Sequence, residues 1–274
     1  GWYSPQGVKL NPFLTVWGGL GTEPGKFNNP KSIVVDSEGN VYVADYNNNR
    51  VQKFTASGTF IKEITGLNKP IGVAVDPFDN LYVTNQGDNL VKKFDNQGNL
   101  ITSWQPAEIG LIEIPNVSGP TVLGEDIAVD NNGQVYLMYD NSYKVRKFTD
   151  TGELLGEWGR YVNNQEALTS MEGGVFSRHQ HAIETLGNYV YVSDSFLNRV
   201  QKFDLDGNYI SDWATDGRGN SLRLRLSISH FVSNMVVAKN RGGMVLTAKN
   251  TANQSQDQPT IAANRKKASR LFPL

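Results

Sequence analysis

Three histidines are the residues of this 274-residue chain best suited to bind a transition metal. His179 and His181 are two positions apart, and alternate residues on a strand point the same way, so both rings could reach one ion. Together with His230 they would supply the three imidazoles of an open zinc site. The alternative interpretation is that His179 and His181 are polar loop residues without a ligand.

A second group of side chains offers oxygen ligands for a hard cation such as Ca²⁺. These are Glu125, Asp126, Asp194, Asp45 and Asn85. The alternative is that Asp45 and Asp194, which recur at one position of a repeat, secure turns through hydrogen bonds. We therefore predict a calcium or zinc site from the set Asp45, Asp126, His181 and Asp194. The predicted ligand-binding set is Glu125, Asp126, His179, His181, Asn85 and Tyr139.

A search for short catalytic motifs does not assign the chain to a class of enzyme. The sequence contains no Gly-x-Ser-x-Gly, no phosphate-binding glycine loop and no His-Glu-x-x-His, which are the short patterns that mark common nucleophilic, phosphate and zinc sites. We predict no catalytic residue.

The elements that must position these side chains come from an internal repeat. One strand pattern, apolar-Tyr-apolar, recurs at Val41–Asp45, Leu81–Asn85, Val135–Tyr139 and Val190–Asp194. An apolar strand precedes each copy, at 33–36, 73–76, 127–130 and 182–185, and a third strand ends in Phe54, Phe94, Phe148 and Phe203. Short strands rich in β-branched and aromatic residues, separated by Gly, Asn and Asp turns, predict antiparallel meanders.

A fourth strand follows a glycine turn in each copy and ends at Ile64, Trp104, Trp158 and Trp213. Four-stranded units at intervals of 40 to 55 residues predict the blades of an all-β propeller. Because these tryptophans and Trp17 hold one place in the repeat, we predict that they pack between blades and do not form a ligand platform.

A fifth, degraded copy begins near Phe231. Without a gap it aligns Val236-Val237 with Ser32-Ile33 and Val245-Leu246 with Val41-Tyr42, but Gln258 replaces the Phe of the third strand. Residues 13–17 resemble an isolated fourth strand. We therefore expect five blades, with this N-terminal strand completing the last blade and removing exposed sheet edges. The whole of 1–274 is predicted to be one domain, with 214–274 as a degenerate, basic last repeat and tail.

These residues resemble NHL repeats, whose pattern Asn40 to Phe54 carries almost completely. The resemblance extends over 11–213 and, more weakly, over 231–256. It implies a β-propeller, for which six blades are usual in the family, in conflict with the count of five.

Loops are expected to carry the function, because loops are where binding residues gather on a rigid scaffold. The connections between blades and the turns between second and third strands must share one face. Three blade-to-blade loops on that face are long, around 105–121, 159–175 and 214–230. We therefore place the predicted binding residues there.

Composition excludes some classes of protein. There is no Cys, so disulfides and thiolate metal sites are excluded, and no apolar run reaches the roughly 20 residues of a membrane span.

The formal net charge is −1, but 214–274 carries ten Lys and Arg against two acids. RNA binding by Arg223, Arg225, Lys239, Arg241 and Lys249 is therefore a third hypothesis, against which stands the scarcity of stacking aromatics nearby.

The leading hypothesis is a non-catalytic, monomeric propeller that binds a protein, peptide or glycan on its loop-rich face. The second hypothesis is a metal-dependent hydrolase or lyase with its site at the mouth of the central channel. The first residue is Gly1 and sequons occur at Asn116 and Asn253. On that basis we expect a secreted or cell-surface protein.

Overall fold

The fold is taken from a computed structural model of the 274-residue chain. It describes residues 2–3, 9–10, 16–106, 123–139, 144–161, 172–176, 180–194, 197, 199–214, 235–240 and 243–248.

Four four-stranded sheets form the body of the molecule, and each is an antiparallel meander. Blade 1 comprises β3 (Pro30–Val35), β4 (Val41–Asp45), β5 (Arg50–Phe54) and β6 (Phe60–Ile64). Blade 2 comprises β7 (Pro70–Val75), β8 (Leu81–Asn85), β9 (Leu90–Phe94) and β10 (Leu100–Trp104). Blade 3 comprises β11 (Leu123–Val129), β12 (Val135–Tyr139), β13 (Val145–Phe148) and β14 (Leu154–Trp158). Blade 4 comprises β17 (Gln180–Leu186), β18 (Tyr189–Asp194), β19 (Arg199–Asp204) and β20 (Tyr209–Ala214).

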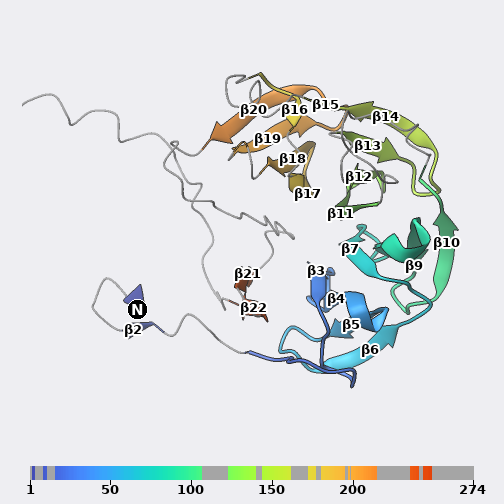
Figure 1. The fold of residues 1–274 in the computed structure, drawn as a ribbon, viewed down its shortest axis with the longest axis vertical. Coiled ribbons are helices and arrows are strands. Elements are labelled where there is room, and N and C mark those ends of the chain that lie inside the picture. Colours follow the sequence, from blue (N-terminus) through green and yellow to red (C-terminus); the bar gives the residue numbers. More distant parts are fainter. Residues whose placement is uncertain are drawn as a thin grey trace, which may run out of the picture.

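The blades are arranged around a common centre in an open arc (Figure 1). The first strands β3, β7, β11 and β17 are innermost and contact one another in sequence, and the last strands β6, β10, β14 and β20 form the rim. Short 3-10 helices η1 (Tyr46–Asn48) and η2 (Gln86–Asp88) follow the second strands of blades 1 and 2. The remaining described strands form three pairs: β1 (Trp2–Tyr3) with β2 (Lys9–Leu10), β15 (Arg160–Tyr161) with β16 (Val175–Phe176), and β21 (Met235–Asn240) with β22 (Gly243–Ala248).

The hydrophobic core lies between the blades, because both faces of each sheet are apolar. We call the face turned toward the next blade in sequence the leading face and the other the trailing face. Tyr82, Val91 and Trp104 on the leading face of blade 2 pack against Ile127 and Leu137 on the trailing face of blade 3. Equivalent clusters join blades 1 and 2 and blades 3 and 4. Burying both faces explains the near-continuous apolar strands of the repeat.

The tryptophans pack between blades, as the repeat predicts. Trp104 is buried within the cluster between blades 2 and 3, and Trp158 packs against the cluster between blades 3 and 4. Trp17 lies against blade 1, with its ring centroid 4.4 Å from that of Phe54. The side chain of Trp213 lies outside the described residues.

The expected number of blades is wrong for the described part of the chain, which contains four blades and not five or six. There the fifth copy contributes only the hairpin β21–β22. The sequence of this copy is degraded at the third strand, where neither Asp257 nor Gln258 matches the phenylalanine that fills the core of blade 1, Phe54, at 0% exposure. Most of residues 13–17 and the third strand of the fifth copy lie outside the described residues, so their predicted pairing stays a prediction.

The gap-free alignment of the fifth copy also needs a correction. Val237 pairs with Leu246 in the hairpin, as Ile33 pairs with Val43 in blade 1. Leu246 therefore takes the position of Val43 and not of Tyr42. The turn before β22 is one residue shorter than in blade 1, and the same shortening occurs in blade 4, where Ile183 pairs with Val192.

Candidate binding face

The two ends of the blades differ in construction. One end, here called the turn face, carries the short turns between first and second and between third and fourth strands. In blade 1, Asp36 accepts hydrogen bonds from the backbone N–H of Glu38 and Asn40 at 3.1 and 2.7 Å. Asp76, Asp95, Asp130 and Asp204 do the same in their turns. The polar side chains of this face are thus largely consumed by their own turns.

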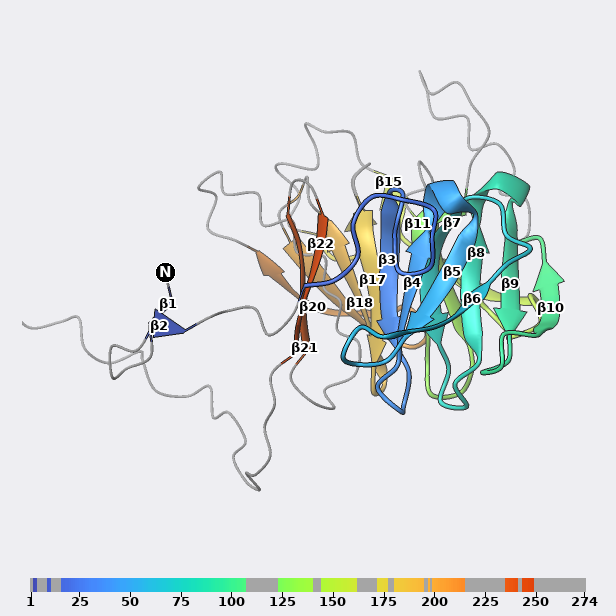
Figure 2. The same cartoon turned by 90° about the horizontal axis from the view of Figure 1, so that it is seen from below.

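The opposite end, here called the loop face, carries the blade-to-blade connections together with η1 and η2, which lie at the top of Figure 2. The start of each first strand pairs with the end of the second strand, as in Pro30 with Asp45 and Gln180 with Asp194. The predicted shared face is therefore confirmed. Differences between blades concentrate at this end, because its loops vary while the turn face repeats.

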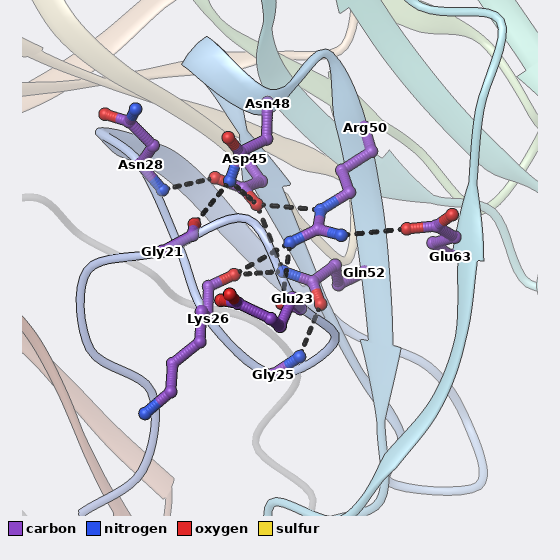
Figure 3. A network of polar contacts seen from close by, with 10 residues as sticks. All are labelled: Gly21, Glu23, Gly25, Lys26, Asn28, Asp45, Asn48, Arg50, Gln52 and Glu63. Atoms are coloured by element: carbon purple, nitrogen blue, oxygen red, sulfur yellow. Dashed lines mark hydrogen bonds and ion pairs between the residues drawn. The ribbon is translucent and has the colours of Figure 1, made fainter.

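Asp45 is the centre of a hydrogen-bond network that holds the loop before β3 (Figure 3). Its carboxylate accepts the backbone N–H of Asn28 at 2.7 Å and the side chains of Asn48, Arg50 and Gln52 at 2.8, 2.9 and 3.1 Å. The residue is fully buried. Four donors from the chain occupy this carboxylate, which agrees with the turn-securing alternative for Asp45 and leaves little room for a cation.

Arg50 and Gln52 extend the network to the backbone of the preceding loop. The Arg50 guanidinium donates to the carbonyls of Glu23 and Lys26, both at 3.0 Å, and pairs with Glu63 at 2.9 Å. Gln52 donates to the Lys26 carbonyl at 2.7 Å and accepts from the Gly25 N–H at 2.8 Å. The loop is therefore held by side chains that start from the sheet.

Blade 4 repeats this arrangement. Arg199 donates to the carbonyls of Glu172 and Val175 at 3.1 and 2.7 Å, and Gln201 bridges the Val175 carbonyl and the Gly174 N–H. Asp194 is buried and accepts the Leu197 N–H at 3.1 Å. The same residue types at the same positions thus fix the loop in two distant blades, so this is a structural device of the repeat.

Blades 2 and 3 carry variants of the device. Asn85 replaces Asp45, accepts the Asn68 N–H at 2.7 Å and donates to Asp88 at 2.6 Å. In blade 3, Lys144 and Arg146 both pair with Glu157. The hydrogen bond from Lys144 and the charges of both bases hold the pKa of Glu157 below its usual value.

Contacts between blades 1 and 2 tie the loop face together. The Tyr46 hydroxyl donates to Gln86 Oε1 at 2.8 Å, and the Lys69 N–H donates to Asn49 Oδ1 at 2.8 Å. Lys31 Nζ lies 5.2 Å from the centroid of the Tyr46 ring. This surface was not predicted from the sequence. The sequence feature that could have indicated this surface is the high amide content of 47–49 and 85–89. Only the fold shows that these two segments lie beside each other in adjacent blades.

The other predicted site residues are placed as follows. Asp126 lies on β11 and accepts the Ile183 N–H of β17 at 3.1 Å, so it joins two innermost strands. Glu125, Tyr139 and His181 lie on β11, β12 and β17, and their side chains, like all of His179 and His230, lie outside the described residues. Among the described side chains, no three His, Asp or Glu residues converge as a metal would require. The metal site stays a prediction.

Sequence reasoning missed one acidic residue of the innermost strands. Glu184 on β17 is half-buried, and desolvation together with the nearby charge of Asp126 raises its pKa well above the usual value. The sequence could have indicated this residue, because the residues aligned with Glu184 in the other three blades, Val34, Ala74 and Ala128, are all apolar.

Four meanders around a centre, with repeated turns at one end and variable loops at the other, define a β-propeller. The profile of the NHL repeat matches residues 27–54. The human E3 ubiquitin-protein ligase TRIM32 is 52% identical over 52 residues, which are 19% of this chain and 8% of that protein. Human NHL repeat-containing protein 3 is 50% identical over 50 residues, 17% of this chain and 14% of that protein. Residues 27–54 thus form an NHL repeat, in agreement with the resemblance found in the sequence.

Solved structures similar to this chain include virginiamycin B lyase from Staphylococcus aureus, with a TM-score of 0.46 and 16% identity over 68% of this chain and 56% of that one. A chain of a nidogen/laminin complex has a TM-score of 0.48 and 17% identity over 69% of this chain and 65% of that one. The segments that match TRIM32 and NHL repeat-containing protein 3 cover only 8% and 14% of those two human proteins. In the described part of this chain, no helix is long and apolar enough to span a membrane.

Proposed function

We propose that this protein is a non-catalytic binding propeller that recognises a protein or peptide on its loop face. The observation that carries the proposal is the fixed surface formed by η1 and η2, where Tyr46 and Gln86 bridge two blades. A propeller built from NHL repeats supports a protein-interaction role, and variable loops on a rigid scaffold are where such a role resides.

The chemistry of this surface suits a polar chain. Side-chain amides both donate and accept hydrogen bonds, as the peptide group does, and the exposed residues Asn47 and Asn49 belong to η1 and its C-cap. Because the loops are already held by the Asp45 network, a ligand would lose little affinity to ordering them. A glycan could exploit the same amides, so peptide and glycan ligands are distinguished by experiment.

The test is a selection of a random peptide library displayed on phage against the immobilised 274-residue chain. We expect enriched peptides to lose about tenfold or more in affinity for a Tyr46→Ala/Asn47→Ala variant, since aromatic anchors often carry much of an interface's free energy. The matched control, Phe78→Ala/Asn96→Ala, removes one exposed aromatic and one exposed amide from the turn face. Peptides that ignore the first variant but lose binding to the control would contradict the proposal.

The two other hypotheses need separate measurements. A metal-dependent hydrolase or lyase predicts near-stoichiometric zinc or calcium in native, tag-free protein, lost in His181→Ala or Asp126→Ala. RNA binding by the basic C-terminal repeat predicts an affinity that falls steeply with salt. Absence of both, with peptide binding present, is the outcome that the proposed function expects.

A further inference from the structure

The leading face of blade 4 differs from the same face of the other three blades. Its central positions are Tyr191 and Val200. Their equivalents in blades 1–3 are almost completely buried by the following blade: Tyr42, Tyr82, Tyr136, Val51, Val91 and Val145, at 0–1% exposure. Tyr191 and Val200 are only partly buried. The centre of this face carries the same residue types as the covered faces of blades 1–3, but among the described residues no following four-stranded blade covers it.

Glu184 is an acidic residue on this face, at a position that is apolar in the other three blades. Since Ile183 pairs with Val192 as Ile127 pairs with Leu137, Glu184 takes the position of Ala128. In the described part of the chain its carboxylate accepts one hydrogen bond, from the adjacent Thr185 N–H at 3.3 Å. Ionising a half-buried carboxyl with so little compensation is costly, and a partner of opposite charge at this position would offset that cost.

The repeat identifies where that partner must lie. Between blades 2 and 3, Ala74 of the leading face shares a cluster with Val129 of the trailing face. Between blades 1 and 2, Val34 and Val75 both pack against one cluster. At these two interfaces, the position equivalent to Glu184 therefore belongs to the same hydrophobic cluster as the position equivalent to Val75 and Val129 in the next blade.

In the fifth copy that position is a lysine. Val237 pairs with Leu246 as Ile183 pairs with Val192, which places Lys239 at the position of Val129. The aliphatic pair at the first two interfaces, and Ala128 with Thr185 at the third, is thus replaced at this one by Glu184 and Lys239, which have opposite charges.

We infer that the leading face of blade 4 is the docking surface of the hairpin β21–β22, with Lys239 opposite Glu184. The hairpin lies on the open side of the arc, between blade 4 and blade 1 (Figure 1). The ion pair would also select the correct surface, because leading faces that present Val34, Ala74 or Ala128 offer Lys239 no counter-charge. Polar pairs buried in an apolar interface can set its register in this way.

The test is hydrogen exchange of residues 235–248 in the full chain, compared among wild type, Glu184→Lys, Lys239→Glu and the charge-swapped double variant. We expect each single change to lower amide protection of the hairpin about tenfold and the swap to restore most of it, as for contacting charges that couple strongly. Glu153→Lys, an exposed turn residue with the same charge change, is the matched control.

A double variant no better protected than the two single changes combined would overturn the inference, as would a hairpin without protection in the wild type. Glu184→Gln and Lys239→Met remove the charges with little change of shape, so they report on the pair even if a reversed charge unfolds blade 4. Light scattering on the same samples identifies the other occupant: a wild-type dimer that Glu184→Lys dissociates would assign the face to a second copy and contradict docking of the hairpin.

Discussion

The indole of Trp104 lies over the α-carbon of Gly152 in the next blade, so closely that a Cβ built on Gly152 would fall 2.2 Å from Trp104 Cδ1. The same relationship joins Trp158 to Gly207 and Trp17 to Gly58. The residue that ends one blade's fourth strand thus requires a glycine in the following blade. Trp17 takes this place on blade 1, where the end of a preceding blade would lie.

Replacing Gly152 by Ala should therefore destabilise the protein by about 3 kcal/mol in chemical denaturation. Part of the loss is the cost of a side chain at a φ of +95°, on the order of 1 kcal/mol, and part is the steric conflict with the tryptophan. Gly133→Ala is the control, since its φ is +78° but its Cβ would meet nothing within 4 Å. Equal losses in the two variants would show that the Trp–Gly contact is unimportant.

Asp45→Asn should lower the free energy of unfolding by about 2 kcal/mol, because it leaves the buried Arg50 with a neutral partner in place of a carboxylate. Glu63 still pairs with Arg50, which limits the loss. We expect the loop of residues 21–28 to become more susceptible to limited proteolysis, since Asn28, Arg50 and Gln52 hold it through Asp45. Unchanged proteolysis and stability would contradict the role assigned to the network.

The reciprocal change in blade 2, Asn85→Asp, should also be destabilising. The Asn85 amide donates to Asp88 Oδ2 at 2.6 Å, so the substitution would place two carboxylates in contact. Combining it with Asp88→Asn should recover stability, because the new pair has one donor and one charge. Thermal denaturation of the three variants measures the effect, and a stable single variant would refute it.

Glu157 should contribute stability that depends on pH. Its pKa is lowered in the folded protein from the ordinary value of 4.5, so its contribution is complete above that value and is lost as pH falls through the folded pKa. Glu157→Gln should cost less than about 1 kcal/mol at pH 7, because the side chain is one-third exposed and screened by solvent. The difference from wild type should shrink as pH falls below 4.5 and through the lowered pKa of Glu157, with Glu153→Gln as control, and a constant difference would contradict the assignment.

The strands could be predicted from the sequence because each is fixed by local chemistry repeated four times. All four predicted fourth-strand ends fall within one residue of the observed ones, from Ile64 to Trp213. The number of blades could not be predicted in this way. A degraded copy keeps the local pattern of two strands, but whether it forms a blade depends on packing against residues that the pattern does not name.

The loop face shows the same limit. The recurrence of Asp45 and Asp194 was visible, and the choice between metal ligand and turn residue depended on what surrounds them. Their partners include the Asn28 N–H at Asp45 and the Leu197 N–H at Asp194, which are backbone groups that any sequence supplies. Likewise, Tyr46 and Gln86 are 40 positions apart, and only the placement of η1 beside η2 brings them together.

Photo-crosslinking tests the proposed function most directly. A benzophenone amino acid placed at Asn47 on the loop face, or at Asn132 on the turn face, would be irradiated in the presence of the library-selected peptide. Both positions are exposed, so the reagent is equally accessible. The proposed function predicts a crosslinked product at Asn47 that excess unlabelled peptide abolishes, and none at Asn132. Crosslinking at Asn132 alone, or equally at both positions, would contradict recognition by the loop face.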